Sequence, residues 1–219
     1  MNALITTVGA SLNRLKNLTS EQLAGYLLNL SNPIKNRDFG AEICSIASII
    51  NRPLIFEREY LYLLASDTEN GRRIGEALRI FFEKSPELSF KTVVLKIVSD
   101  LDDARPKEFQ NKFLRNVVKE IAEIYKHHID HLAINATGGF KAQIALAQAF
   151  GMAVKVPVYY KFETFDGVIE IPPMPISLDV ELWLENKGLL DTLEMNSVIN
   201  ERDLEAEYDY RVNFSVLPP

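Results

Sequence analysis

Two patterns of apolar and polar residues alternate along the chain. Short apolar runs, typical of buried strands, lie at residues 3–8, 59–66, 90–98, 131–136 and 153–162. Between them, apolar residues recur at i, i+3, i+4 and i+7, the spacing of one helix face, as in the stripe Ile43, Ile46, Ala47 and Ile50. The regular succession of strand and helix predicts an α/β protein.

Helix boundaries are marked by residues that cap or interrupt helices. Thr19 and Gln22 have the spacing of a capping box, and Asp38 is a suitable N-cap for the next helix. Pro106 suits the first turn of a long helix. Gly151 is expected to end the alanine-rich helix that starts at Lys141, so that a strand can begin at residue 153.

The order of these elements predicts the sheet. Parallel neighbours need crossover connections, so we expect a Rossmann-like fold, a mainly parallel sheet with helices on both faces. Phe165-Asp166-Gly167 predicts the turn of a C-terminal β-hairpin, and a short helical tail follows the proline-rich stretch that begins at Pro172. We therefore expect a ligand-binding domain at residues 1–176 and a short extension at residues 177–219.

Small and polar residues follow the predicted strands, where ligands bind in folds of this type. In NATGGFK, Gly138 and Gly139 remove side chains where a ligand would approach the backbone, and the next helix offers free N–H groups. Asn135 and Thr137 add hydrogen-bonding groups, and the ammonium group of Lys141 can reach a phosphate. The sequence predicts an anion site here.

A second loop repeats this arrangement after the first strand, at Gly9-Ala10-Ser11-Leu12. The two loops share one crevice if their strands are close in the sheet. An alternative stays open for each of these loops, because Gly-Gly also suits a tight turn before a helix and Ser11 also suits a helix N-cap. Ser66, Asp67 and Thr68 are candidates for contacts with a base or ribose, and equally good cap residues.

Composition and motifs exclude several function classes. The net charge of −6 disfavours binding to duplex nucleic acid, and no apolar run approaches the roughly 20 residues of a membrane helix, so we expect a cytoplasmic protein. The chain has no P-loop motif and no G-x-G-x-x-G after a strand. The single cysteine, Cys44, lies among apolar residues and suits a packed core thiol, and His127, His128 and His131 cluster at a helix end without metal-ligand spacing. We expect neither a metal nor a cofactor.

Taken together, TVGASL, NATGGFK and the tyrosine-rich hairpin VPVYYKFETFDGVIEIPPMPI resemble the CARF domains of CRISPR-associated proteins, over about residues 1–176. CARF domains are Rossmann-like ligand sensors of type III CRISPR defence. The resemblance implies a homodimer that binds a cyclic oligoadenylate, of four or six nucleotides, across its two-fold axis. It also implies that the sensor regulates an effector domain or partner, which would be absent from this chain.

The resemblance assigns ligand contacts to three loops. These contacts are Gly9, Ala10, Ser11 and Leu12 in the first loop, Ser66, Asp67 and Thr68 in the second, and Asn135, Thr137, Gly138, Gly139, Phe140 and Lys141 in the third. Some family members cleave their ligand without a metal, so a ring nuclease is the alternative function, with Lys141 and Ser11 as its catalytic residues. An unrelated Rossmann enzyme that uses another nucleotide, such as NAD or S-adenosylmethionine, is a second alternative.

Overall fold

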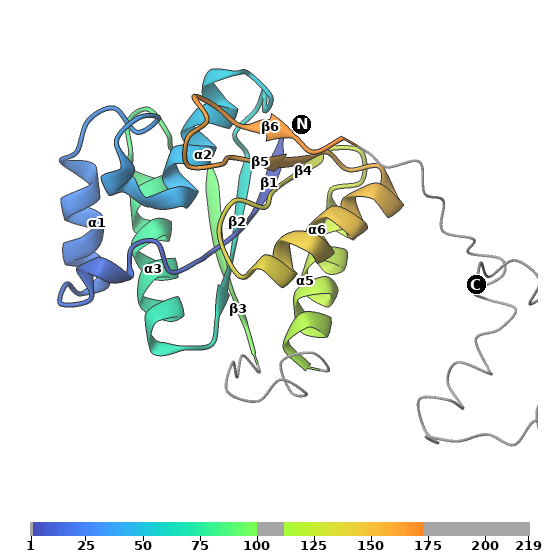
Figure 1. Ribbon diagram of the computed structural model, residues 1–219, viewed down its shortest axis with the longest axis horizontal. Coiled ribbons are helices and arrows are strands. Elements are labelled where there is room, and N and C mark those ends of the chain that lie inside the picture. The colour runs from blue at the N-terminus through green and yellow to red at the C-terminus, as the bar shows by residue number, and fades with distance from the viewer. Residues whose placement is uncertain (1, 100–111, 173–219) are drawn as a thin grey trace, which may run out of the picture. The chain divides into compact units, whose positions relative to one another are not determined.

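The computed structural model describes residues 2–99 and 112–172. Its centre is one sheet of six strands in the order β3-β2-β1-β4-β5-β6 (Figure 1). The strands are β1 (Ala3–Thr7), β2 (Tyr60–Ser66), β3 (Thr92–Val98), β4 (Leu132–Asn135), β5 (Val158–Tyr160) and β6 (Ile169–Glu170). All neighbouring strands are parallel except β5 and β6, which form the predicted hairpin.

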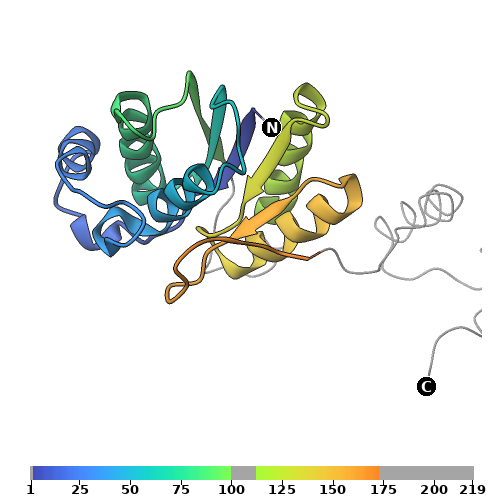
Figure 2. The ribbon, with the colours of Figure 1, turned by 90° about the horizontal axis from the view of Figure 1, so that it is seen from above.

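Helices cover both faces of this sheet, as the sequence predicted. The helices are α1 (Ser20–Leu28), α2 (Gly40–Asn51), α3 (Glu69–Lys84), α5 (Leu114–His127) and α6 (Lys141–Val154), with 3-10 turns at Asn13–Leu15 and Arg37–Phe39. Figure 2 shows α1, α2 and α3 on one side of the strands and α5 and α6 on the other. The expected fold class, a mainly parallel Rossmann-like sheet, is therefore confirmed.

Strand alternation produces two hydrophobic cores. Successive residues of a strand point to opposite faces, so Leu4 of β1 packs in the core that includes α1, α2 and α3, while Ile5 packs in the core that includes α5 and α6. Both side chains are completely buried. Because both faces of the central strands are covered, those strands are apolar on both sides, which explains their continuous apolar runs.

The strand order reverses at the β1–β4 pair. From β1 the chain proceeds outward through β2 to β3, and after β3 it returns to place β4 on the other side of β1. Loops that leave the carboxyl ends of two such strands diverge in opposite directions, which opens a crevice where ligands bind in folds of this class. The loops after β1 and β4 are the ones that carry Ser11 and the glycine pair.

The predicted starts of α1 and of α6 are confirmed, but two other predicted helix boundaries are wrong. Thr19 and Gln22 form the expected capping box. Asp38 does not cap α2; it lies in the preceding 3-10 turn, where its carboxylate pairs with Arg14 at 2.7 Å. Gly151 does not end α6, which continues to Val154 and places Lys155 in a left-handed C-cap. In consequence β5 begins only at Val158, and residues 153 and 154 are helical rather than extended.

Several predictions concern residues outside the described ranges. Contacts divide the chain into the units Met1–Met174 and Pro175–Pro219, and all described residues belong to the first. Pro106, the end of the proline-rich stretch and the helical tail lie outside the described residues, so the predicted extension at residues 177–219 stays a prediction. Within residues 2–99 and 112–172, no helix combines the length and apolar character needed to cross a membrane.

Candidate functional site

The loops after β1 and β4 pack backbone against backbone. The Thr7 hydroxyl donates a hydrogen bond to the carbonyl of Gly138. A Cβ atom built on Gly9 would lie 2.5 Å from the backbone nitrogen of Gly139, closer than a real Cβ atom tolerates. Gly139 also has a φ of +94°, a conformation that favours glycine. These glycines are therefore needed for the loops to meet, whether or not a ligand binds.

A buried carboxylate holds the first loop in place. Glu42 lies in the first turn of α2 and has no exposed surface. Its Oε1 accepts a hydrogen bond from the Gly9 N–H at 2.6 Å, and its Oε2 accepts one from the Ser11 hydroxyl at 2.8 Å. A Cβ atom on Gly138 would lie 2.4 Å from Oε1, so the carboxylate is also packed against the loop after β4. Sequence reasoning missed Glu42, because the groups that its carboxylate contacts become its neighbours only in the folded chain.

Asn135 stands at the end of β4, where it is fully buried. Its Nδ2 donates to the Ser45 hydroxyl at 2.8 Å, and its Oδ1 accepts from the Thr137 hydroxyl at 2.7 Å. Ser45 in turn donates to the main-chain carbonyl of Glu42 at 3.0 Å. The polar groups of Asn135 are thus engaged inside the protein, and the residue positions Thr137 instead of facing outward.

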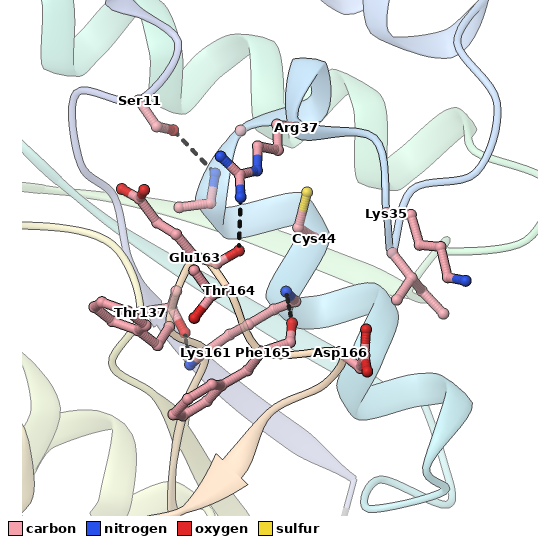
Figure 3. A pocket seen from close by; sticks show the side chains of 14 residues that line it. Ser11, Lys35, Arg37, Cys44, Thr137, Lys161, Glu163, Thr164, Phe165 and Asp166 are labelled. Carbon is pink, nitrogen blue, oxygen red and sulfur yellow. Dashed lines mark hydrogen bonds between the residues drawn. The ribbon is translucent and has the colours of Figure 1, made fainter.

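A pocket of about 540 Å³ opens beside these loops. It lies between the N-terminal end of α2, the loop after β1 and the turn that joins β5 to β6 (Figure 3). Its polar wall consists of three hydroxyl groups, three cationic side chains and two carboxylates, which belong to Ser11, Thr137 and Thr164, to Lys35, Arg37 and Lys161, and to Glu163 and Asp166. Two predicted ligand contacts, Ser11 and Thr137, therefore face one cavity, together with three cationic side chains that the sequence analysis did not single out.

Lys161 connects the hairpin to the loop after β4. Its backbone N–H donates to the Thr137 hydroxyl at 3.0 Å, and its Nζ donates to the carbonyl of Phe165 at 2.7 Å (Figure 3). Arg37 reaches the same hairpin through a hydrogen bond from Nη2 to the carbonyl of Glu163 at 3.3 Å. An ammonium group has three donors, so Lys161 keeps two of them for a ligand.

Cys44 is a buried side chain at the edge of this pocket. It is 8% exposed, and its thiol donates weakly to the carbonyl of Asn36 at 3.4 Å. Burial raises the pKa of the Cys44 thiol to about 11. The thiol is therefore protonated at neutral pH, which agrees with a packed side chain and not with a nucleophile.

The remaining predicted contacts lie away from the pocket wall. Leu12 is completely buried in the core. Lys141 is exposed and is the first residue of α6, as expected, and Phe140 directly before it is 39% exposed. Ala10 is exposed beside Ser11. Leu12 therefore has no surface to offer a ligand, whereas Ala10, Phe140 and Lys141 remain candidates for contacts with a ligand that extends beyond the pocket.

The loop after β2 is occupied by local interactions. Thr68 caps α3 by accepting from the Gly71 N–H at 3.0 Å, and it exchanges a hydrogen bond with Ser66 at 3.0 Å. Asp67 pairs with Arg72 at 2.6 Å. None of the three residues lines the pocket. Among the described residues there is also no group of three or more His, Cys, Asp or Glu side chains that could hold a metal ion.

Comparison with models of known protein families shows the family to which this chain belongs. Residues 37–174 match the model of the family described as CRISPR-associated protein (Cas_APE2256). The chain belongs to this CRISPR-associated family. The match begins at Arg37 and includes the glycine pair and the whole β5–β6 hairpin, whereas Ser11 and Lys35 of the pocket precede it. The CRISPR-associated character that the sequence motifs implied is therefore confirmed.

Three solved structures are similar to this CRISPR-associated chain at low identity. One is Can2 from Sulfobacillus thermosulfidooxidans in complex with cyclic tetra-adenylate, at 14% identity and a TM-score of 0.38, covering 73% of this chain and 31% of Can2. The second is Enterococcus italicus Csm6 bound to cyclic hexa-2′-fluoro-hexa-dAMP, at 10% identity and a TM-score of 0.45, covering 94% and 43%. The third is protein VC1899 from Vibrio cholerae, at 9% identity and a TM-score of 0.39, covering 80% and 34%. The matched region spans less than half the length of each of these proteins.

Proposed function

We propose that this chain is a homodimeric sensor that binds a cyclic oligoadenylate of four or six nucleotides in type III CRISPR defence. The ligand class is the one implied by the resemblance of its motifs to CARF domains, and membership of a CRISPR-associated family supports it. Binding would regulate an effector that is attached or separate. A cytoplasmic location is part of the same proposal.

One observation carries this proposal: the glycine-containing loops after β1 and β4 meet at the point where the strand order reverses. The close approach of Gly9 and Gly139 leaves backbone and small side chains at the carboxyl ends of β1 and β4. A helix N-terminus follows directly at Lys141, and its first N–H groups carry a partial positive charge. A polyanion that presents phosphates to both loops suits this surface better than a neutral ligand does.

A cyclic ligand explains why a dimer would be required. The pocket of one chain has an open side, with exposed Phe162 and Phe165 in the hairpin next to it. A two-fold dimer offers the same loops twice, and a ring of four or six identical nucleotides contains the matching two-fold symmetry. Each protomer would then bind one half of the ring.

Titration calorimetry with cyclic tri-, tetra- and hexa-adenylate tests the proposal. We expect one ring to bind per two chains, with linear oligoadenylate of the same length binding more weakly because it is less preorganised. Sedimentation of the free and the bound protein gives the oligomeric state. If none of the rings binds at micromolar concentrations, the sensor function is wrong.

One arrangement favours the second candidate function, a ring nuclease. Ser11 and Lys161 line the same pocket, so a ribose and its neighbouring phosphate can lie between a hydroxyl group and an ammonium group. In such a reaction the 2′-hydroxyl loses its proton, the O2′–P bond forms as the P–O5′ bond breaks, and the 5′-oxygen takes up a proton. Lys161 would stabilise the charge that develops on the phosphate. Lys141, which the sequence favoured for this role, does not line the pocket.

Incubation of the wild-type protein with each ring in excess EDTA, followed by chromatography, separates the two functions. A ring nuclease converts the ring to linear products with a 2′,3′-cyclic phosphate, and Ser11→Ala or Lys161→Met slows that conversion. A sensor returns the ring intact after hours. Either result leaves the binding measurement above valid.

A further inference from the structure

Of the three hydroxyl groups that line the pocket, those of Ser11 and Thr137 donate their protons to groups inside the protein. A serine or threonine hydroxyl has one donor and two acceptor positions. Ser11 donates to Glu42 Oε2 at 2.8 Å. It also accepts from the Ala41 N–H at 3.1 Å, the hydrogen bond drawn beside Ser11 in Figure 3. Its proton and one lone pair are therefore used, and one lone pair is left for the pocket.

Thr137 is arranged in the same way. It donates to Asn135 Oδ1 at 2.7 Å and accepts from the Lys161 N–H at 3.0 Å. The orientation of the Asn135 amide is fixed by Ser45, whose proton goes to the Glu42 carbonyl at 3.0 Å, so that its oxygen must accept from Asn135 Nδ2 at 2.8 Å. Asn135 therefore presents its carbonyl oxygen to Thr137, and Thr137 must be the donor.

We infer that Ser11 and Thr137 act toward the ligand only as hydrogen-bond acceptors, and that Glu42 and Asn135 impose this polarity as positioning residues. The inference rests on the proposed function, which it makes more specific. A phosphodiester offers only acceptors, so it gains nothing from these two hydroxyls and must be bound by cations such as Lys161 and Arg37. The hydroxyls instead select ligand groups that donate.

Two groups of a cyclic oligoadenylate can donate: the ribose 2′-hydroxyl and the exocyclic amine of adenine. We assign the 2′-hydroxyl to Ser11, because Ser11 and Lys161 line one pocket and a ribose 2′-hydroxyl is adjacent to a phosphate in every nucleotide. The pocket would thereby distinguish a ribonucleotide ring from its deoxy or 2′-fluoro counterpart through the polarity of one hydrogen bond.

Replacing Glu42 by glutamine reverses that polarity with almost no change of shape. The Gly9 N–H can only donate, so it keeps the side-chain oxygen of Gln on its side and turns the amide nitrogen toward Ser11. Ser11 then accepts from both the amide and the Ala41 N–H, and its proton turns toward the pocket. Glu42→Gln therefore changes Ser11 from an acceptor into a donor, whereas Ser11→Ala removes both capacities.

The experiment compares the Kd of the ribo ring, its 2′-fluoro analogue and an analogue in which purine replaces adenine, for the wild type and these variants. Short incubations on ice limit any cleavage. We expect the wild type to bind the 2′-fluoro ring about tenfold more weakly than the ribo ring, which is the size of one neutral hydrogen bond. This ratio should fall toward one in Ser11→Ala. Glu42→Gln should keep most of its affinity for the ribo ring, because the 2′-hydroxyl can also accept the hydrogen bond that Ser11 then donates.

The outcomes separate the possibilities. The wild type can instead bind the purine ring more weakly than the ribo ring, with this difference in Kd absent from Ser11→Ala. In that case Ser11 is an acceptor, and the ligand group that donates to it is the exocyclic amine of adenine. If the wild type binds all three rings equally, or if Ser11→Ala and Thr137→Val weaken every ring by the same factor, the inference is wrong while the sensor function stands. If no ring binds, both fail. Thermal unfolding of each variant identifies any that do not fold, and Ser11→Ala, at an exposed position, serves where Glu42→Gln is unstable.

Discussion

Gly9 and Gly139 belong to loops that are far apart in the sequence, yet a Cβ atom on Gly9 would lie 2.5 Å from the backbone nitrogen of Gly139. The contact joins two main chains, neither of which can rotate away as a flexible side chain would. The position of the candidate site therefore depends on the absence of one carbon atom.

The first prediction follows from this contact. Gly9→Ala should separate the two loops, lower the free energy of unfolding by about 1–3 kcal/mol and weaken ring binding, because the added methyl group has no space. Gly25→Ala is the control, since nothing lies within 4 Å of a Cβ atom there and it is a helical position. That control should gain about 0.5–1 kcal/mol. Urea denaturation measures both, and equal stability of the two variants would contradict the packing argument.

The second prediction compares how much Lys161 and Lys141 contribute to ring binding. Lys161 lines the pocket, whereas Lys141 is exposed at the start of α6, so Lys161→Met should weaken ring binding more than Lys141→Met does. We expect about a tenfold loss for Lys161→Met at low salt and a smaller loss at high salt, because the phosphate interaction is screened. Lys119→Met, at an exposed position on α5, is the control. Calorimetry at two salt concentrations gives the ranking, and the reverse order would return the main phosphate contact to Lys141.

The fold was predictable because its signals are local. Apolar runs gave the strands, and the Thr19–Gln22 pair marked the start of α1 through hydrogen bonds confined to four residues. The prediction that Gly151 ends α6 was wrong because this glycine is needed for tertiary packing and not for a helix end. A Cβ atom there would lie 2.3 Å from a methyl group of Val158 and 2.7 Å from the carbonyl oxygen of Val156. The glycine is required for α6 to pack on the following strand, and its sequence position alone resembles a helix end.

The site was predictable only in part. The loops after β1 and β4 could be identified because ligands bind at strand ends in this fold class. Glu42 and Lys161 could not, because their roles depend on which segments meet in space. Glu42 acts on Gly9 in the loop after β1, which is 33 residues earlier in the sequence. Lys161 reaches Thr137 only because the hairpin lies beside β4.

A third prediction concerns Cys44. Since burial raises the pKa of its thiol to about 11, only about 0.1% of it is thiolate at pH 8, and alkylation should be about 100-fold slower than for a cysteine of ordinary pKa. Limited access slows it further. Because Cys44 lies at the pocket, bound ring should lower the rate again. Mass spectrometry after timed iodoacetamide treatment gives these rates, with the urea-unfolded protein as the reference. Rapid alkylation of the folded protein would show that the thiol is not buried.

The last prediction concerns the contact between His128 and Tyr62, whose Oη lies 2.8 Å from His128 Nε2. Partial burial lowers the pKa of His128, and the neighbouring His127 and His131 lower it further. The unfolded chain therefore takes up a proton at a higher pH than the folded chain does. This histidine contributes stability above its unfolded pKa of about 6.5, and that contribution is lost as pH falls through the lower folded pKa.

We thus expect the free energy of unfolding to decrease as the pH is lowered below about 6.5, and part of that decrease to disappear in His128→Gln, which removes the titrating group while keeping a hydrogen-bond partner for Tyr62. His127→Gln is the matched control because His127 is exposed on the same helix end. It should retain most of the pH dependence. Urea denaturation between pH 5 and pH 8 measures the slopes, and an unchanged slope in His128→Gln would mean that the pH dependence arises elsewhere in the chain.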